Sequence, residues 1–268
     1  MAKLAINEMT TFKWSFEEDV QHCLAADISA IGVWRQKLSD FGEAKGVELL
    51  ADSGMTVSSL QWAGGFTGSD GRGYRDSVTD ACDAVRTAAE LQAGCLVVYS
   101  GGRGGHTRNH ARRLLRGALS DMIAVADELD VTLAIEPMHV QCGAEWTFLN
   151  TAEETIELLD AAGANQVELV FDTYHLCQQD QPTTAIESLT PRIALVQLGD
   201  SRSPPEGEQN RCPLGEGQLP LAEVISQLTS AGYDGYFEVE LIGEDVEAMD
   251  YQALIENSKA AFDTIGAM

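Results

Sequence analysis

The amino-acid sequence predicts an α/β protein with a single (β/α)8 barrel, a TIM barrel, that spans residues 1–268. Eight short apolar segments alternate with segments of helical periodicity, and this is the number of strand–helix units in such a barrel. A doubly wound sheet more usually stops at about five or six strands. No linker-like stretch divides the chain, and the apolar fraction of 44% is normal for a protein with a large core.

The first four strand–helix units are expected in the first half of the chain. The predicted strands cover residues 3–7, 28–34, 56–62 and 95–99. Helices are expected from Ser15, which can cap a first turn rich in acidic residues, and over residues 37–51, 75–92 and 109–129. Glycine-rich loops, residues 63–73 and 100–106, follow the third and fourth strands. The first is typical of a functional lid. For the second, a close approach of backbone to substrate and ordinary turn chemistry are equally good explanations.

The last four units are expected in the second half. The predicted strands cover residues 132–136, 167–172, 193–198 and 236–242, and the predicted helices cover residues 151–161, 182–189, 220–232 and 247–265. Thr151 and Glu154 have the spacing of a capping box. Pro220 and Gly232 are suited to begin and end the helix between the last two strands. A long polar loop, residues 199–218, follows the seventh strand.

The charge of the chain argues against several classes of function. There are 17 basic and 42 acidic residues, a formal net charge of −25 at pH 7. Such a protein repels phosphate backbones and anionic lipid, so we expect neither nucleic acid nor a membrane as a partner. No apolar run approaches ~18 residues, and polar residues interrupt the amino terminus too early for a signal-peptide core. The six cysteines are scattered without C-x-x-C spacing, which indicates free thiols in a cytoplasmic protein.

Four oxygen-bearing side chains stand where the last four predicted strands end. They are Glu136, Asp172, Gln197 and Glu240. Any one of them alone would more often be a helix cap, a surface charge or half of an ion pair. Together they fall at neighbouring strand ends, which form the rim where barrel active sites are built. Three carboxylates at one rim repel one another, so we expect one divalent metal ion between them. An all-oxygen ligand set favours magnesium or manganese, with zinc as the alternative.

The last strand carries a second carboxylate with the same orientation. Glu238 and Glu240 are two residues apart and therefore face the same side of the strand. Glu240 is nearer the carboxyl end of the strand, so we expect it to be the metal ligand. Glu238 is then expected one layer deeper in the barrel, where a carboxylate needs a partner.

The strand-end residues lie within short motifs. These are Ala134-Ile135-Glu136-Pro137-Met138-His139, Asp172-Thr173-Tyr174-His175, Gln197, Leu214-Gly215-Glu216-Gly217, and Gly232-Tyr233-Asp234-Gly235 followed by Glu240. In order and spacing they resemble the sugar isomerase and epimerase families of the xylose isomerase-like barrel superfamily, from about the fourth strand to the carboxyl terminus. Many members have histidine at the position of Gln197. Hydroxypyruvate isomerases are similar to this chain in having glutamine there, and in the loop of residues 202–210.

The resemblance implies a metal-dependent isomerase or epimerase. It places one divalent ion on Glu136, Asp172, Gln197 and Glu240, and it makes a sugar or a small α-hydroxy-carbonyl compound the substrate. A metal ion bound to such a substrate acidifies the C–H bond next to the carbonyl. Glu136 and Glu240 are then expected to remove and return the proton through a cis-enediolate. The carbon that receives the proton decides between isomerisation and epimerisation.

Further residues are candidates for substrate binding. His175 resembles a family residue that contacts a substrate oxygen, and the alternative is a loop histidine with structural hydrogen bonds. Arg202 and Arg211 follow the seventh strand, where either could hold a substrate hydroxyl, carboxylate or phosphate, and the motif favours Arg211. The remaining candidates are His139, His106, Trp14, Trp34 and Trp62. The three tryptophans would either line the pocket or pack in the core.

Three other functions share parts of this pattern. A metal-dependent dehydratase or lyase of a keto-sugar or inositol-type substrate would remove the same proton and then lose a β-hydroxyl, so its products would differ. An apurinic endonuclease would share the barrel, but it needs a histidine-rich zinc cluster and a basic surface, which this composition opposes. A catalytically silent sugar-binding barrel would not need two opposed glutamates. The oligomeric state is left open, and a homo-oligomer is compatible with the sequence.

Overall fold

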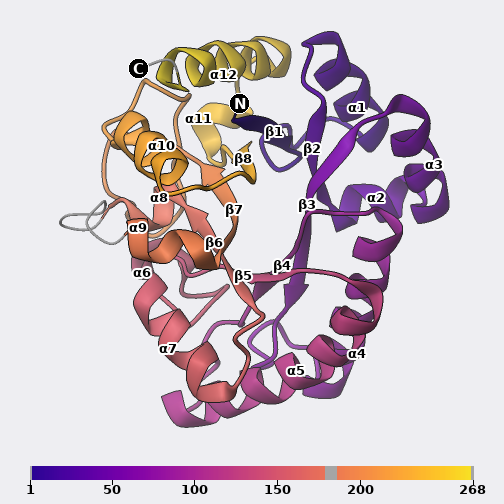
Figure 1. The fold of residues 1–268 in the computed structure, drawn as a ribbon, viewed down its shortest axis with the longest axis vertical. Helices are drawn as coiled ribbons and strands as arrows, with labels where there is room; N and C mark the ends of the chain where they lie inside the picture. Colours follow the sequence, from indigo (N-terminus) through magenta and orange to yellow (C-terminus); the bar gives the residue numbers. More distant parts are fainter. Residues whose placement is uncertain (1, 179–185, 267–268) are drawn as a thin grey trace.

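The computed structural model describes residues 2–178 and 186–266, and in these the strands form a closed parallel barrel (Figure 1). The strands are β1 (Lys3–Asn7), β2 (Ala30–Trp34), β3 (Thr56–Gly64), β4 (Leu96–Tyr99), β5 (Leu133–Ile135), β6 (Glu168–Asp172), β7 (Ile193–Leu198) and β8 (Tyr236–Val239). Each strand pairs with the next, and β1 pairs with β8 to close the ring. The helices lie outside this ring (Figure 1). The predicted (β/α)8 barrel is confirmed.

The strands differ from the predicted ranges mainly at the ends that form the rim. β3 continues to Gly64, into a segment that the sequence assigns to a loop. β5 and β8 end just before Glu136 and Glu240. The neighbouring strand still holds both backbones, because Glu136 donates its N–H to Val98 O at 3.3 Å and Glu240 donates to Leu198 O at 3.0 Å. Both glutamates therefore keep fixed positions although they lie outside the regular ladder.

The helices follow the predicted order, with additional short turns. The longer helices are α1 (Phe16–Ala25), α2 (Arg35–Phe41), α3 (Glu43–Ser53), α4 (Tyr74–Glu90), α5 (Arg108–Leu129), α7 (Ala152–Ala162), α10 (Leu221–Ser230) and α12 (Tyr251–Gly266). The shorter ones are α6 (Val140–Gly143), α8 (Thr173–Leu176), α9 (Ile186–Leu189), α11 (Glu244–Glu247) and the 3-10 turn η1 (Thr190–Arg192). Ser15 and Glu18 form a capping box on α1, and Thr151 caps α7 by accepting from the N–H of Glu154.

Three predicted helices need correction. Residues 37–51 fall in two helices, α2 and α3, because Gly42 lies between them with a φ of 104° that helical residues do not adopt. The last helix begins at Tyr251, after the separate short helix α11. Residues 182–185 of the predicted helix 182–189 lie outside the described residues, and the remainder is α9. The short helices α6, α8 and α11 span about one turn each, too little to show a helical period in the sequence.

Apolar side chains pack in two regions. A large core joins the strands to the surrounding helices. A smaller cluster, with Val97, Ala134, Val170 and Leu195, joins alternate residues of four neighbouring strands, as expected for side chains that point into a barrel. All six cysteines are free thiols, as predicted. Among residues 2–178 and 186–266, no helix is both long and apolar enough to cross a membrane.

Glu238 is a fully buried carboxyl on β8, and the structure identifies its partners. Asn7 Nδ2 donates to Oε1 at 2.6 Å, and Ser58 Oγ and Ser59 Oγ donate to Oε2 at 2.6 Å and 2.8 Å. Burial raises the pKa of Glu238, and these hydrogen bonds offset only part of that shift. A Cβ added to Gly32 would lie 2.5 Å from this carboxyl. The glycine therefore leaves the space that the carboxyl occupies.

We predict that Gly32→Ala destabilises the barrel, because the new methyl group would displace the Glu238 carboxyl from its hydrogen bonds. The free energy of unfolding, measured by urea denaturation, should fall by about 1–3 kcal/mol, the usual cost of overpacking a core. Gly266→Ala is the matched control, because a Cβ there meets no atom within 4 Å. It should change the free energy of unfolding by less than about 0.5 kcal/mol. Equal stability of the two variants would contradict the described packing around Glu238.

Candidate active site

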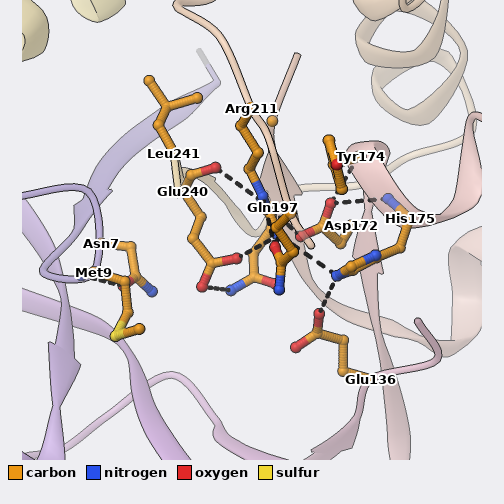
Figure 2. Close-up of polar contacts among 12 residues, drawn as sticks. Asn7, Met9, Glu136, Asp172, Tyr174, His175, Gln197, Arg211, Glu240 and Leu241 are labelled. Carbon is orange, nitrogen blue, oxygen red and sulfur yellow. Dashed lines mark hydrogen bonds and ion pairs between the residues drawn. The ribbon is translucent and has the colours of Figure 1, made fainter. Parts of the chain in front are cut away.

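The four residues predicted from the strand ends come together at the rim of the barrel (Figure 2). All are buried, with exposed fractions of 1% for Glu136, 0% for Asp172 and Gln197, and 2% for Glu240. Asp172 and Gln197 are paired across β6 and β7. In Figure 2, Glu240 and Glu136 lie on opposite sides of Gln197. The site therefore presents two glutamates that face each other across an amide and an aspartate.

Glu238 and Glu240 set the orientation of Gln197. Its Nε2 donates to Glu240 Oε1 at 3.3 Å and to Glu238 Oε1 at 3.4 Å. An amide nitrogen donates and a carboxylate accepts, so this contact assigns the nitrogen to the β8 side and leaves Oε1 on the other. No described residue donates a hydrogen bond to Gln197 Oε1. The glutamine thus holds two carboxyl groups with one end and offers an oxygen with the other.

Three buried oxygens of the site accept no hydrogen bond from the described residues. They are Glu136 Oε2, Asp172 Oδ2 and Gln197 Oε1. A buried polar atom without a partner costs about 1–3 kcal/mol, so such atoms usually indicate a bound ion, a water molecule or a functional demand. Oxygens from three neighbouring strands form a ligand set that suits a hard divalent cation. The residues present therefore fit the metal ion expected from the sequence.

Arg211 places a positive charge among these carboxylates. It is the largest fully buried side chain among the described residues. Its Nη1 lies 2.9 Å from Asp172 Oδ2 and forms an ion pair with it, but the angles do not meet those of a hydrogen bond. The same Nη1 donates a hydrogen bond to the backbone oxygen of Glu240 at 2.8 Å. Its Nη2 lies 3.0 Å from Glu240 Oε2 (Figure 2). Gln209 Oε1 accepts hydrogen bonds from Nε and Nη2 of Arg211. Burial lowers the pKa of Arg211, but Asp172 and Glu240 outweigh it and raise that pKa above its usual value.

Burial also controls the protonation of the two glutamates. It raises the pKa of Glu136 well above the usual value, and the charges of Glu240 and Asp172 raise it further. It raises the pKa of Glu240 to about 7, although Arg211 acts in the opposite direction. A carboxyl with a pKa near neutrality can accept and release a proton at physiological pH. A cation bound beside these groups would lower both pKa values.

His175 is a buried, neutral histidine beside Glu136. Burial lowers the pKa of its ring to about 3. The backbone N–H of His139 donates to Nδ1 at 3.3 Å, so the proton of the neutral ring is on Nε2. His175 Nε2 lies 3.7 Å from Glu136 Oε1. Arg211 Nη2 is 3.5 Å from the same His175 Nε2, which is too far for a strong hydrogen bond. Ligand atoms of Glu136, Asp172 and His175 all lie within 4.8 Å of one another. However, a protonated Nε2 is a donor, which suits a substrate oxygen better than a metal ion.

A cavity of about 870 Å³ lies against this cluster. Its lining includes Glu136, Arg211 and Glu240, and residues 203–210 of the long loop after β7. Residues 242–245, which follow β8, line it as well. The cavity gives a small molecule access to both glutamates.

Among the tryptophans predicted to face the pocket, Trp62 lines the cavity. The other candidates from the sequence are not among the lining residues of this cavity. They are Arg202, His139, His106, Trp14 and Trp34, and also His175, Asp172 and Gln197, which lie in the buried cluster next to the cavity. The side chain of Arg202 is 52% exposed, and its Nη2 lies 2.5 Å from Glu216 Oε2 in an ion pair. The ring of Trp34 stacks on Phe12 at 5.7 Å between centroids. These two side chains are therefore engaged elsewhere on the rim.

The sequence interpretation missed several residues that line the cavity. Gln61, near the end of β3, is buried, and its side chain lies beside Glu240, where it acts to lower the pKa of that carboxyl. Tyr99 is the last residue of β4. The strand-end rule, applied to β3 and β4 as it was to β5–β8, would have found both. Trp146 follows the short helix α6 in an irregular segment, where no periodic pattern indicates it.

Comparison with known proteins identifies relatives of the chain. Residues 20–263 match the protein family described as xylose isomerase-like TIM barrel. An inosose isomerase of Bacillus velezensis is 23% identical over 98% of this chain and 96% of that protein. A D-psicose 3-epimerase of Enterocloster bolteae is 32% identical, but this match covers 44% of the chain and only 36% of the epimerase.

Two solved structures have the same fold over nearly their whole length. A protein from Sinorhizobium meliloti 1021 has a TM-score of 0.90 and 26% sequence identity, and the match covers 98% of both chains. The IOLI protein, solved with a bound zinc atom, has a TM-score of 0.81 and 20% identity, and the match covers 99% of this chain and 98% of that one. The barrel is therefore shared over the full described length.

We predict that Arg211→Gln strongly destabilises the protein in buffer with a metal chelator, because Asp172 and Glu240 lose the cation that compensates them. Removal of one partner from a buried ion pair typically costs about 3–5 kcal/mol, to be measured by urea denaturation. Arg202→Gln removes an exposed ion pair and is the matched control, with an expected loss below about 1 kcal/mol. If the two variants lose the same stability, Arg211 does not compensate the buried carboxylates.

Proposed function

The chain belongs to the xylose isomerase-like TIM barrel family, and we propose that it is a divalent-metal-dependent isomerase or epimerase of a sugar or small α-hydroxy-carbonyl compound. One observation carries this proposal. The buried glutamates Glu136 and Glu240 line one cavity and lie on opposite sides of Gln197. The relatives named inosose isomerase and D-psicose 3-epimerase support the reaction class.

The proposed metal ligands are Glu136, Asp172, Gln197 and Glu240. The three buried oxygens without hydrogen bonds support this assignment, as does the zinc atom in the related IOLI structure. The all-oxygen ligand set favours magnesium or manganese, and zinc is the alternative. When bound, a divalent cation polarises the substrate carbonyl and increases the acidity of the adjacent C–H bond.

The two glutamates are proposed to exchange protons with the substrate. One, as a carboxylate, accepts the proton from the carbon next to the carbonyl, and the electron pair of the broken C–H bond forms an enediolate. The other, as a carboxylic acid, donates a proton to that enediolate. Return to the same carbon from the opposite face gives epimerisation. Donation to the former carbonyl carbon, with a proton moved between the two oxygens, gives isomerisation. The raised pKa values of Glu136 and Glu240 support this exchange.

Neighbouring residues are proposed to orient the substrate and the two glutamates. His175 can donate its Nε2 proton to a substrate oxygen, since Nδ1 is occupied by a backbone donor. Arg211 lines the cavity, where it can contact a substrate oxygen, and it holds Asp172 and Glu240. Trp62 supplies an apolar wall. Arg202, His139 and Trp34 are left out of the proposed site because they do not line the cavity. His175 does not line it either, but it is kept because its ring lies 3.7 Å from Glu136 Oε1.

We predict that Glu240→Gln and Glu136→Gln each lower kcat by ~100-fold or more, the effect of losing a general acid or base. Glutamine keeps the size of the side chain and one ligand oxygen, but it cannot carry the proton. Activity should be measured on ketoses, inososes and hydroxypyruvate with added magnesium or manganese. During wild-type turnover in deuterium oxide, mass spectrometry should detect deuterium at the carbon next to the carbonyl.

Glu238→Gln is the matched control for this experiment. It makes the same chemical change two residues away, at a position that does not line the cavity. It should change the free energy of unfolding and lower kcat far less than the two site variants, because Glu238 orients Gln197 but does not exchange a proton with the substrate. Normal turnover by both site variants, together with no deuterium uptake under any condition, would rule out the proposed proton transfer. Product analysis also separates an isomerase or epimerase from a dehydratase, whose product lacks one hydroxyl group.

A further inference from the structure

A second cavity, of about 440 Å³, lies directly beside the first. The two cavities share five lining residues, which are Trp62, Tyr99, Ala144, Glu145 and Trp146. The rest of the second cavity is lined by the glycine-rich loops that follow β3 and β4, which the proposed function does not use. The shared residues therefore place the second cavity next to the space in front of Glu136 and Glu240.

Three aromatic rings form most of the shared wall. Trp62 stacks on Tyr99 with ring centroids 5.1 Å apart. The ring of Trp146 contacts both edge-on, with centroid distances of 5.5 Å to Trp62 and 6.2 Å to Tyr99. Trp146 is nevertheless 42% exposed, which leaves much of a large apolar ring in contact with water. Fixed aromatic rings that are open on one side can pack against the apolar face of a sugar ring.

The loops around the second cavity are held in place. Gly101 and Gly102 donate their N–H groups to Trp146 O and Glu145 O at 2.9 Å and 3.0 Å. A Cβ on Gly102 would lie 2.6 Å from Ala144 O, so only glycine allows this approach. Thr67, in the other glycine-rich loop, donates its hydroxyl to Gly102 O. The glycines therefore serve to pack three loops against one another, and the cavity that these loops enclose is preformed.

The charge of the main cavity excludes anionic groups. Eight of its lining residues are acidic, and Arg211 is its one basic lining residue. The guanidinium of Arg211 is already engaged with Asp172, Glu240 and Gln209. Six of the acidic lining residues lie outside the proposed metal-ligand set, so even with a cation bound, a phosphate or carboxylate in the main cavity would meet a negative field without a free basic lining residue. This favours a substrate without an anionic group.

The size of the main cavity indicates a large substrate. Its volume of about 870 Å³ is near the upper end of the roughly 300–1,000 Å³ range of pockets for drug-sized ligands. A three-carbon acid or a single sugar ring would leave most of this space, and all of the second cavity, to water. The shared aromatic wall begins next to the catalytic cluster, because Tyr99 and Trp62 line the same cavity as Glu136.

We propose that the Trp62–Tyr99–Trp146 wall is a binding subsite for a second sugar ring, and that the substrate is a neutral, two-ring glycoside. Its reacting sugar unit carries the α-hydroxy-carbonyl group and lies at Glu136 and Glu240, and its other ring packs on Trp146. This assignment rests on the proposed function, because that function defines which ring reacts.

The test compares neutral one-ring and two-ring glucosides with a phosphorylated monosaccharide. Cellobiose, maltose, laminaribiose, isomaltose, methyl glucoside and glucose 6-phosphate are titrated into the manganese-loaded protein, and affinity is measured by calorimetry or ligand-observed NMR. We expect at least one disaccharide to bind about tenfold more tightly than methyl glucoside, the gain from one good aromatic contact. Trp146→Ala should abolish this gain without changing the affinity for methyl glucoside. Glucose 6-phosphate should bind more weakly than methyl glucoside.

Phe12→Ala is the matched control, since Phe12 is an aromatic residue of similar exposure, 47%, that lines neither cavity. It should leave every affinity unchanged. The proposal is overturned if no disaccharide binds more tightly than methyl glucoside, if Trp146→Ala does not reduce the gain, or if glucose 6-phosphate binds best. Binding is measured without turnover, so these outcomes are separate from the catalytic test. Turnover of a monosaccharide with no second-ring effect would refute this inference alone, and normal turnover by the two glutamine variants would refute the proposed function alone.

Discussion

The burial of three carboxyl groups at one rim is the constraint on which the site depends. Glu136, Asp172 and Glu240 lie close together, and water screens their repulsion poorly in the barrel interior. Arg211 supplies one positive charge, but burial and the neighbouring carboxylates still raise the pKa of both glutamates. A divalent cation would complete the compensation. The burial of these carboxyl groups therefore lowers the stability of the fold and also raises the pKa values that allow proton transfer.

The barrel supports this unfavourable cluster through hydrogen bonds that extend from the interior to the rim. Asn7 and two serines hold Glu238 in the interior, and Gln197 links Glu238 to Glu240. Arg211 then joins Glu240 to Asp172. Glu240 and Asp172 are thus held by residues from other strands or from the loop after β7, and the backbone of Glu136 is held by its hydrogen bond to Val98 O. Fixed positions of this kind are what catalysis by proton transfer requires.

The sequence was sufficient for the parts of the fold and site that follow a repeating rule. Period-two apolar runs located all eight strands, and the strand-end rule brought Glu136, Asp172, Gln197 and Glu240 to one rim. The rule was not applied to β3 and β4, so Gln61 and Tyr99 were missed. Trp146 and the short helices have no period to detect, because their positions depend on packing between loops. The partners of Glu238 also came only from the structure, since Ser58 and Ser59 are about 180 residues away in the chain.

The central claim, that the rim carboxylates and Gln197 bind one divalent cation, can be tested most directly by anomalous diffraction. Crystals soaked in manganese chloride would be measured at the manganese absorption edge. We predict one strong peak within about 2.0–2.6 Å of oxygens from Glu136, Asp172, Gln197 and Glu240, the range of hard-cation coordination. A strong peak elsewhere in the molecule, or no peak at a saturating manganese concentration, would contradict the account.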